Sequence, residues 1–439
     1  MDAHGGRWGR NDGGDPTSAA CDTVDGVATR EATGPPTARM AGVPAAPDAL
    51  AYLDHAATTP LRPEARAAML PWLGGAFGNP SGAHPVARAA RQAIDEARDT
   101  IAAVLGCAPN EVVFTGGGTE ADNLAVRGVV AARPGAVLCS AVEHHAVLHP
   151  VEHVGGKTVP VDRRGRLDLD ALADALDAHP AATLVSVMGA NNEVGAIQPV
   201  AAAARLVRER APGAALHCDA VQAVAWLDPT ELTAAVDLVS VSAHKFGGPQ
   251  GVGVLVVRRG TPLQAQLLGG GQERELRSGT HNVAGIVGMA AALAAKSEHR
   301  AAEAARVGAL RDRLAAGLLG AVDGAFETAA PGGDRGRDHL LPGTLHLGIP
   351  GVESEALLFL LDEAGVCASA ASACASGAQE ASHVLAAMGV PADPRLGAVR
   401  LSLGWTSTGA DVDRVLDVLP AAVDRLRGAD RGTHGGAVR

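Results

Sequence analysis

The sequence predicts an α/β fold: a large domain with a mixed, mostly parallel sheet flanked by helices, and a smaller α+β domain at the C-terminal end. Two observations predict it. Between about residues 50 and 305, short apolar runs alternate with stretches rich in Ala, Arg and Glu, as in buried parallel strands joined by helices. After about residue 305, a long charged helical pattern leads into Gly-, Pro- and Asp-rich sequence, which indicates a second domain.

The predicted elements alternate along the chain. Strands are expected at Glu111–Phe114, Ala136–Ser140, Thr183–Met188, Ala215–Cys218, Leu238–Ser242 and Gly253–Val257, with a later one at Gly343–Leu347. Helices are expected at Pro85–Leu105, Leu169–Ala178, Val200–Arg210, Ala284–Leu319, Ser354–Ala364 and Asp411–Arg427.

The domain organisation follows from these elements. Residues 1–47 lack apolar periodicity and are expected to form a disordered arm, with Met40 as an alternative start. The large domain is predicted over residues 48–305 and the small domain over residues 306–427. Residues 428–439 are expected to be a flexible tail.

The composition excludes several classes of protein. With 439 residues and 47% hydrophobic content, the chain can bury a large core and is not disordered throughout. A net charge of −11 argues against direct nucleic-acid binding. The longest apolar or glycine run, Val283–Ala295, is shorter than the roughly 20 residues that span a membrane, and no secretory signal is recognisable.

Cysteine and lysine usage are both informative. The 6 cysteines are scattered without a CxxC pair, which favours reduced thiols in the cytoplasm and argues against a metal or iron–sulfur site. Among the 37 basic residues, the lysines are Lys157, Lys245 and Lys296 alone. Because arginine stays protonated and is not a nucleophile, a remaining lysine is a candidate for chemistry that needs an amine.

Lys245 is the strongest such candidate. The predicted strand ending at Ser242 leads into Ala243-His-Lys245 and a Gly/Pro loop, and functional loops lie at the carboxyl ends of parallel strands. A lysine there can form a Schiff base. The alternative for Lys245 by itself is an ordinary surface lysine.

Asp219 ends another apolar strand, 26 residues before Lys245. Pyridoxal phosphate requires such a carboxylate, which keeps the pyridine nitrogen protonated so that the ring acts as an electron sink. The alternative is a cap for the next helix. An Asp at the end of one strand and a Lys just after a later strand together favour a cofactor site over a helix cap.

Three further segments fit a phosphate-bearing cofactor. Gly118 and Thr119 follow a strand and open a helix, where amides and a hydroxyl can bind phosphate, although a glycine turn alone is weak support. His144 can lie on a pyridine ring and move protons, or be a solvated histidine. Asn191 and Asn192 can bond a phenolate-type oxygen, or merely form a turn.

Together these segments resemble cysteine desulfurases of the NifS and IscS type, in the class V aminotransferase group of fold-type I pyridoxal-phosphate enzymes. The resemblance covers about residues 50 to 425. It includes the segments Tyr52–Pro60, Phe77–Ser81, Gly118–Glu120, Glu143–His144, Asn191–Glu193, Asp219–Gln222, Ser242–Lys245 and Arg277–Thr280.

The resemblance implies a role for each matching residue. Lys245 would bind the cofactor aldehyde, Asp219 would pair with the ring nitrogen, and His144 would stack on the ring and assist proton transfer. Asn192 and Gln222 would contact the ring oxygen region. The phosphate would be held by Gly118, Thr119, Ser242 and His244, and by Thr280 from a partner subunit, which implies a homodimer. Arg400, with Asn192, would bind the substrate carboxylate.

Cys374 is the candidate nucleophile. It lies in residues 368–378, which contain only Ala, Ser, Gly and Cys, so a mobile loop is expected. A thiol on such a loop suits a nucleophile that must travel, and the resemblance agrees. Cys367 is the rival, but its place after Asp362–Val366 indicates a strand position leading into the loop.

The implied activity is removal of sulfur from L-cysteine, giving L-alanine and a persulfide on Cys374 for iron–sulfur cluster assembly or thiolation of tRNA or cofactors. A protein acceptor would take the sulfur, but the C-terminal tail does not resemble the segment with which housekeeping relatives dock their scaffold. The alternatives are a C–S lyase, a selenocysteine lyase or an aminotransferase of the same fold, and more remotely a non-catalytic scaffold.

Overall fold

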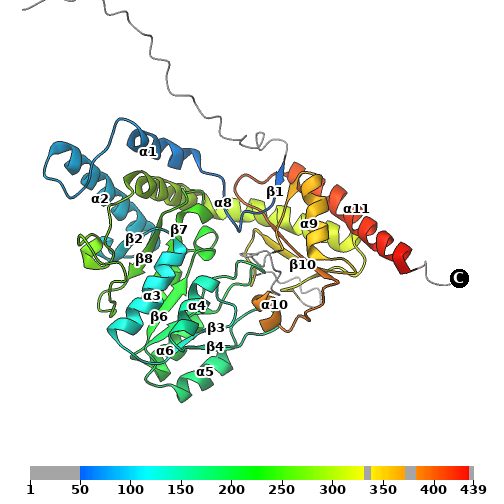
Figure 1. Ribbon diagram of the computed structural model, residues 1–439, viewed down its shortest axis with the longest axis horizontal. Helices are drawn as coiled ribbons and strands as arrows, with labels where there is room; N and C mark the ends of the chain where they lie inside the picture. Colours follow the sequence, from blue (N-terminus) through cyan, green and yellow to red (C-terminus); the bar gives the residue numbers. More distant parts are fainter. Residues whose placement is uncertain (1–49, 331–337, 371–381, 435–439) are drawn as a thin grey trace, which may run out of the picture. The chain divides into compact units, whose positions relative to one another are not determined.

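A seven-stranded sheet forms the centre of the computed structural model, which describes residues 50–330, 338–370 and 382–434 (Figure 1). The strand order is β2-β8-β7-β6-β5-β3-β4. In chain order the strands are β2 (Val112–Thr115), β3 (Val137–Ser140), β4 (Lys157–Val159), β5 (Leu184–Ser186), β6 (Ala215–Asp219), β7 (Leu238–Ser242) and β8 (Gly253–Val257). β8 is antiparallel to both its neighbours and the other pairs are parallel, so the predicted mixed, mostly parallel sheet is confirmed.

Helices cover both faces of this sheet. Alternate strand residues face opposite sides: Leu184 and Leu238 pack with α3 and α4, whereas Val185 and Val239 pack with the helices of the other face. The helices are α1 (Pro63–Leu73), α2 (Pro85–Leu105), α3 (Gly118–Ala132), α4 (His145–His153), α5 (Leu169–Ala178), α6 (Val200–Arg210), α7 (Pro229–Ala235) and α8 (Val283–Ala321). Short 3₁₀ turns are η2 (Pro109–Glu111), η3 (Ala223–Ala225), η4 (Ala243–Lys245) and η5 (Glu273–Glu275).

The bounds of several helices were predictable because their capping signals are local. α2 starts with Pro85 after the cap His84, whose ring accepts the Ala87 amide at 3.3 Å, and it ends at Gly106 with φ 66°. α5 is capped by Asp168, which accepts the amides of the first turn. The helices predicted at Pro85–Leu105, Leu169–Ala178 and Val200–Arg210 are confirmed to the residue.

A second core lies against a smaller antiparallel sheet, in which β10 (Thr344–Pro350) pairs with β9 (Phe326–Glu327) and with β12 (Leu396–Ser402). Its helices are α9 (Ser354–Glu363), α10 (His383–Ala387) and α11 (Gly409–His434). Near the start of the chain, β1 (Ala51–Tyr52) pairs in parallel with β11 (Val366–Cys367), and Ala51 and Leu53 belong to this second core. The prediction assigned residues from 48 onwards to the large domain, so it did not include the pairing of β1 with β11 or the place of Ala51 and Leu53 in the second core.

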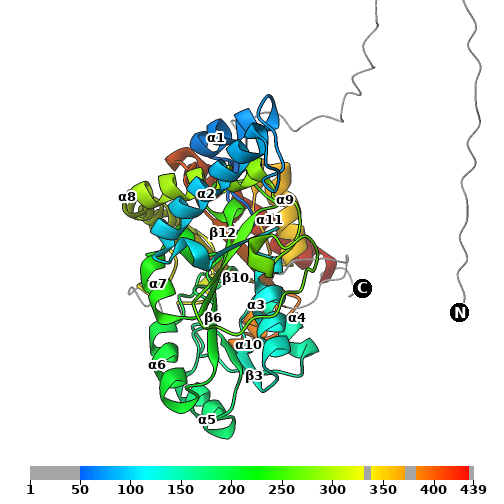
Figure 2. The same cartoon turned by 90° about the vertical axis from the view of Figure 1, so that its left-hand side faces the viewer.

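α8 runs without a break through the predicted boundary at residue 305 (Figure 1), and the turned view of Figure 2 looks nearly along its axis. Its residues from Ile286 to Leu293 contribute to the core beneath the large sheet, and those from Val307 to Leu318 contribute to the second core. The division at residue 305 therefore falls inside one helix that both cores share, and the domain bounds stay a prediction.

The C-terminal end corrects one expectation. The tail predicted from Gly428 onwards is wrong in part, because α11 continues to His434. Gly428 and Gly432 are poor helix formers, but extending an existing helix costs far less than starting one. The predicted arm, residues 1–47, and the last residues, 435–439, lie outside the described part of the chain. No helix among the described residues is long and apolar enough to cross a membrane.

Candidate active site

The carboxyl ends of β5, β6 and β7 open into one cavity of about 270 Å³. Nine of the residues predicted for the site line it: Gly118, Thr119, His144, Asn192, Asp219, Gln222, Ser242, His244 and Lys245. Asp122, Met188, Ala190 and Val221 complete the lining. Because parallel strands end at the same edge of a sheet, motifs that are up to 127 positions apart in sequence, from Gly118 to Lys245, meet there.

The glycine turn forms the open end of this cavity. Gly117, at the start of α3, has φ 149°, a conformation that other residues rarely adopt. A Cβ atom on Gly118 would come within 2.9 Å of a Val221 methyl group, so the backbone approaches the next loop closely. The turn is braced by Glu120, which accepts the Gly116 amide at 2.7 Å and pairs with Arg277 at 2.6 Å. The result is a helix N-terminus with free amides beside Ser242 and His244.

Lys245 is held at the closed end. Its Nζ donates to the backbone oxygens of Ala56 at 2.6 Å and Ala57 at 2.9 Å. Burial, and then the nearby charge of Arg400, lower the pKa of Lys245 to about 8, although Asp219 acts in the opposite direction. A lowered pKa gives a larger neutral fraction, and the neutral amine is the nucleophilic form.

Asp219 is 4% exposed, and its Oδ1 accepts the Val221 amide at 2.9 Å. Burial raises the pKa of Asp219 to about 6, while that amide and Lys245 act to lower it. A buried carboxylate facing a cavity is costly unless a cation or a hydrogen-bond donor faces it. The site is therefore suited to a ligand with a protonated nitrogen.

The imidazoles of His144 and His244 also face the cavity. His144 caps α4, and its Nδ1 accepts the Ala146 amide at 3.1 Å. His244 Nδ1 lies 3.2 Å from Thr58 Oγ1. Removal from water, and then Lys245, lower the pKa of each ring to about 4, so both imidazoles are neutral at pH 7. A neutral ring can stack on a ligand or accept a proton without introducing a second cation.

Arg400 reaches the site from β12 of the small sheet. Its Nη1 donates to the Asn192 backbone oxygen at 2.9 Å, and its Nη2 pairs with Asp54 at 2.7 Å. Asp54 was not predicted as a site residue, because it lies 346 positions from Arg400 and no local pattern connects the two. The nearest signal was its place in the Tyr52–Pro60 motif.

Of the other predicted residues, Arg400 does not line the cavity itself but contacts the backbone oxygen of Asn192, which does. Thr280 is exposed and does not line the cavity either. Cys374 lies outside the described residues. Its rival Cys367 lies in β11, paired with Tyr52, and burial raises the pKa of its thiol, which disfavours the thiolate that a nucleophile requires.

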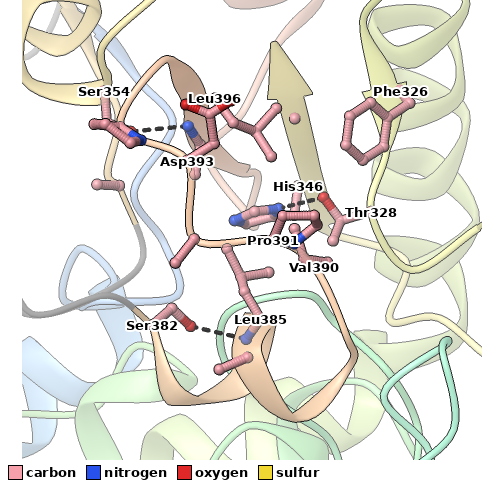
Figure 3. A pocket seen from close by; sticks show the side chains of 16 residues that line it. Phe326, Thr328, His346, Ser354, Ser382, Leu385, Val390, Pro391, Asp393 and Leu396 are labelled. Atoms are coloured by element: carbon pink, nitrogen blue, oxygen red, sulfur yellow. Dashed lines mark hydrogen bonds between the residues drawn. The ribbon is translucent and has the colours of Figure 1, made fainter. Parts of the chain in front are cut away.

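A second cavity of about 290 Å³ lies in the small domain (Figure 3). Its walls are mainly apolar and include Phe326, Leu385 and Leu396. His346, 2% exposed, contacts Thr328 Oγ1 through Nδ1 at 2.8 Å, while its Nε2 has no hydrogen-bond partner among the described residues. None of the predicted site residues that the structure describes lines this second cavity.

The first cavity fits pyridoxal 5′-phosphate on three counts. The α3 amides with Thr119, Ser242 and His244 offer phosphate donors at one end. The buried Asp219 carboxylate can receive the ring N–H. At the closed end, Lys245 presents an amine with a lowered pKa, which an aldehyde requires.

Comparison with known proteins agrees with this geometry. The family model described as aminotransferase class-V matches residues 51–415. The chain belongs to this family, whose enzymes use pyridoxal phosphate, so the predicted cofactor and fold are confirmed.

Within the family the chain falls among the cysteine desulfurases of the NifS and IscS type, as predicted. It is 45% identical over 392 residues to an IscS-like cysteine desulfurase of Mycobacterium tuberculosis, covering 87% of this chain and 98% of the relative. It is 46% identical to a cysteine desulfurase of Cereibacter sphaeroides, covering 86% of this chain and 96% of the relative. A solved NifS-like protein superimposes with a TM-score of 0.78 at 35% identity, covering 86% of this chain and all of that one.

Proposed function

We propose that this chain is a cysteine desulfurase that takes sulfur from L-cysteine, releases L-alanine and carries the sulfur as a persulfide on Cys374. The observation that carries the proposal is that Lys245 and Asp219 line one cavity, while Arg400 contacts the backbone oxygen of Asn192 in its wall. An amine, a buried carboxylate and a guanidinium are what an amino-acid substrate and a pyridine cofactor need. A structural relative, described as SspA in complex with cysteine, gives further support at a TM-score of 0.68 and 29% identity, covering 80% of this chain and 98% of that chain.

The chain's own residues divide the work at the cofactor. Bound pyridoxal phosphate supplies an aldehyde and an electron-poor ring that stabilises negative charge on the substrate. Lys245 supplies the amine that binds the aldehyde, and the Ala56 and Ala57 carbonyls hold its Nζ in place. Asp219 would keep a proton on the ring nitrogen, and Gln222 and Asn192, which line the same cavity, would contact the ring oxygen region.

Proton transfer falls to Lys245 and His144. With the cofactor bound, the Lys245 Nζ, whose pKa is lowered, would be the base for the proton of the substrate Cα. His144, neutral at pH 7 and also in the cavity wall, would accept or return a second proton. Neither step requires a charged residue to enter the cavity.

Arg400 orients the substrate. Its guanidinium is buried and already aligned by Asp54 and by the Asn192 oxygen, so little side-chain entropy is lost when a carboxylate binds. The planar guanidinium suits bidentate contact with a carboxylate. This arrangement favours α-amino acids over simple amines.

Cys374 is the proposed sulfur acceptor of the enzyme. Its thiolate attacks the substrate sulfur, an S–S bond forms, and the Cβ–S bond breaks with its electron pair left on carbon. Protonation of that carbon gives alanine. Support comes from the described residues that follow Cys374 in sequence: Ser382 Oγ donates to Glu193 at 2.6 Å, and His383 Nε2 contacts the Glu143 oxygen at 3.0 Å. Glu193 and Glu143 each adjoin a residue of the cavity.

The working unit is proposed to be a homodimer in the cytoplasm, in which Thr280 reaches the phosphate of the partner subunit. Thr280 is exposed, and the same stretch carries the exposed apolar side chain Leu268 (85%). A sulfur-acceptor protein of iron–sulfur cluster assembly or of a thiolation pathway would take the outer sulfur of the Cys374 persulfide. Light scattering of the holoenzyme tests the dimer, and a monomeric mass would contradict it.

The test is release of alanine and sulfide from L-cysteine with a reductant present, for the wild type, Cys374→Ala and the matched control Cys367→Ala. We expect equimolar alanine and sulfide from the wild type, a loss of at least about 100-fold in Cys374→Ala and a change of less than about threefold in Cys367→Ala. Pyruvate instead of alanine would indicate a C–S lyase. Turnover indifferent to Cys374 would contradict the persulfide step and favour a selenocysteine lyase or an aminotransferase.

A further inference from the structure

A row of polar side chains crosses three central strands of the large sheet. Ser186 on β5 lies 2.9 Å from His217 Nδ1 on β6, and His217 Nε2 lies 3.0 Å from Ser240 on β7. All three residues are fully buried. Central strands of a parallel sheet are normally apolar on both faces, and buried polar groups are costly unless they are bonded to one another.

Asp122 connects this row to the cofactor cavity. It lies on α3, is 1% exposed and lines the cavity together with Asp219. Its Oδ1 lies 3.6 Å from His217 Nε2 and has no hydrogen-bond partner in the part of the chain that the structure describes. Ser240 hydrogen-bonds its carboxyl group. Sequence reasoning missed this residue, although Asp122 is an acid on the same buried face of the helix as Ala121, Leu124 and Ala125.

The charges around Asp122 are of the wrong sign for a carboxylate. Asp219 and the buried Glu143 both repel a negative charge there, and burial followed by Asp219 raises the pKa of Asp122 well above its ordinary range. His217 offers no counter-charge, because burial lowers its pKa to about 3. The charge of Lys245 lowers the pKa of Asp219.

We propose that Asp122 is a positioning residue that holds a proton beside Asp219, so that Asp219 alone carries the negative charge facing the cofactor ring nitrogen. The row of Ser186, His217 and Ser240 can accept a hydrogen bond from this proton while all three side chains stay neutral. The Asp122 O–H can donate to Ser240 Oγ, the Ser240 hydroxyl to His217 Nε2, and His217 Nδ1–H to Ser186 Oγ. The proposal assumes that Asp219 acts on bound pyridoxal phosphate, as the proposed function requires.

Infrared spectroscopy of the apoprotein at pH 7 tests the protonation directly. We expect a buried carboxylic-acid C=O band to which Asp122 and Glu143 both contribute, and Asp122→Asn should remove about half of its intensity. Glu143→Gln is the matched control and should remove the other part. A band that Asp122→Asn leaves intact would mean that Asp122 is ionised, and would overturn the proposal. If Asp122→Asn does not fold, Ser240→Ala should shift the same band by weakening its hydrogen bond.

A second readout separates this proposal from the proposed function. The affinity of the apoprotein for pyridoxal phosphate, followed by its visible absorbance, should fall at least about tenfold more in Asp219→Asn than in Asp122→Asn, because only the first substitution removes a charge. Equal losses would show that both carboxylates are ionised. A wild type that binds no pyridoxal phosphate would instead refute the proposed function, while leaving the infrared result valid.

Discussion

The cofactor cavity and the small-domain cavity have similar volumes, about 270 and 290 Å³, but they differ in what faces the space. The first is lined by an amine, two carboxyl groups and two imidazoles; Asp122 comes from α3, and the other four residues end or follow neighbouring strands. The second is mainly apolar, and its buried imidazole, His346, is bonded on one side only. Volume alone would not distinguish the two, whereas the number of converging titratable groups does.

Their buried histidines sharpen this difference. Burial lowers the pKa of both His217 and His346 to about 3, so both rings are neutral. His217 has a hydroxyl at each nitrogen and belongs to a row that leads to the cofactor cavity. His346 lies opposite Arg400 across the β10–β12 pair, and Arg400 adds to its lowered pKa. The same side chain is therefore part of a network in one region and a packing residue in the other.

The largest effect is expected from removing the Lys245 amine, which distinguishes the cofactor cavity from the second cavity. Lys245→Ala leaves the volume of the cofactor cavity almost intact but removes its nucleophile. We expect alanine production to fall by about 10³-fold or more, together with loss of the visible absorbance of covalently bound cofactor. The matched control is Lys296→Arg, which keeps a cation beside Glu303, away from the cofactor cavity. Retained absorbance in Lys245→Ala would contradict the assignment.

Arg400 is the next largest contributor. Arg400→Gln leaves Asp54 without its ion partner and the substrate without its carboxylate contact. We expect the KM for L-cysteine to rise by about 100-fold, with a smaller change in kcat. Steady-state kinetics at saturating cofactor measure both values. A fall in kcat at constant KM would show that Arg400 does not bind the substrate in the ground state.

The pH dependence of cofactor binding gives a smaller effect. Because the pKa of Lys245 is lowered to about 8, the neutral amine fraction rises about tenfold per pH unit below that value and levels off above it. The rate of pyridoxal phosphate incorporation into apoprotein should follow this curve between pH 6 and 10. An amine with the ordinary lysine pKa would give a rate that still rises at pH 10, which would refute the lowered value.

The smallest effect is expected in the small-domain cavity. His346→Leu together with Thr328→Val replaces both members of a buried polar pair by apolar groups, which is nearly neutral in free energy. We expect turnover to change by less than about threefold and the Tm by less than about 4 °C. Calorimetry and alanine release measure these. A loss of turnover comparable to that of Arg400→Gln would show that this cavity takes part in the reaction.

The features that the sequence predicted best are those set by neighbours in the chain. Helix caps such as His84 and Asp168, and strands that end in Asp219 or Ser242, carry their signals within a few residues. A parallel sheet then brings the strand ends to one edge, so the cavity followed from local patterns.

Contacts between distant parts of the chain were not predictable in this way. The Asp54–Arg400 ion pair and the β1–β11 pairing join the two ends of the described chain, and no periodicity marks them. Asp122 was missed for a different reason. In sequence it looks like an ordinary helix residue, and only the structure shows that it adjoins the buried row of Ser186, His217 and Ser240. The position of Cys374 in the fold stays a prediction.

The pairing of β1 with β11 has a consequence for the order of assembly. During synthesis, Ala51 and Leu53 leave the ribosome long before Val366, the partner of Ala51, and before Val399 and Leu401, which share their core. The seven strands of the large sheet are complete by Val257, so this sheet can form while the first strand still waits for its partner. Arg400 then joins Asp54 only when β12 docks, and the substrate-binding side of the cavity is completed in one of the last steps of folding.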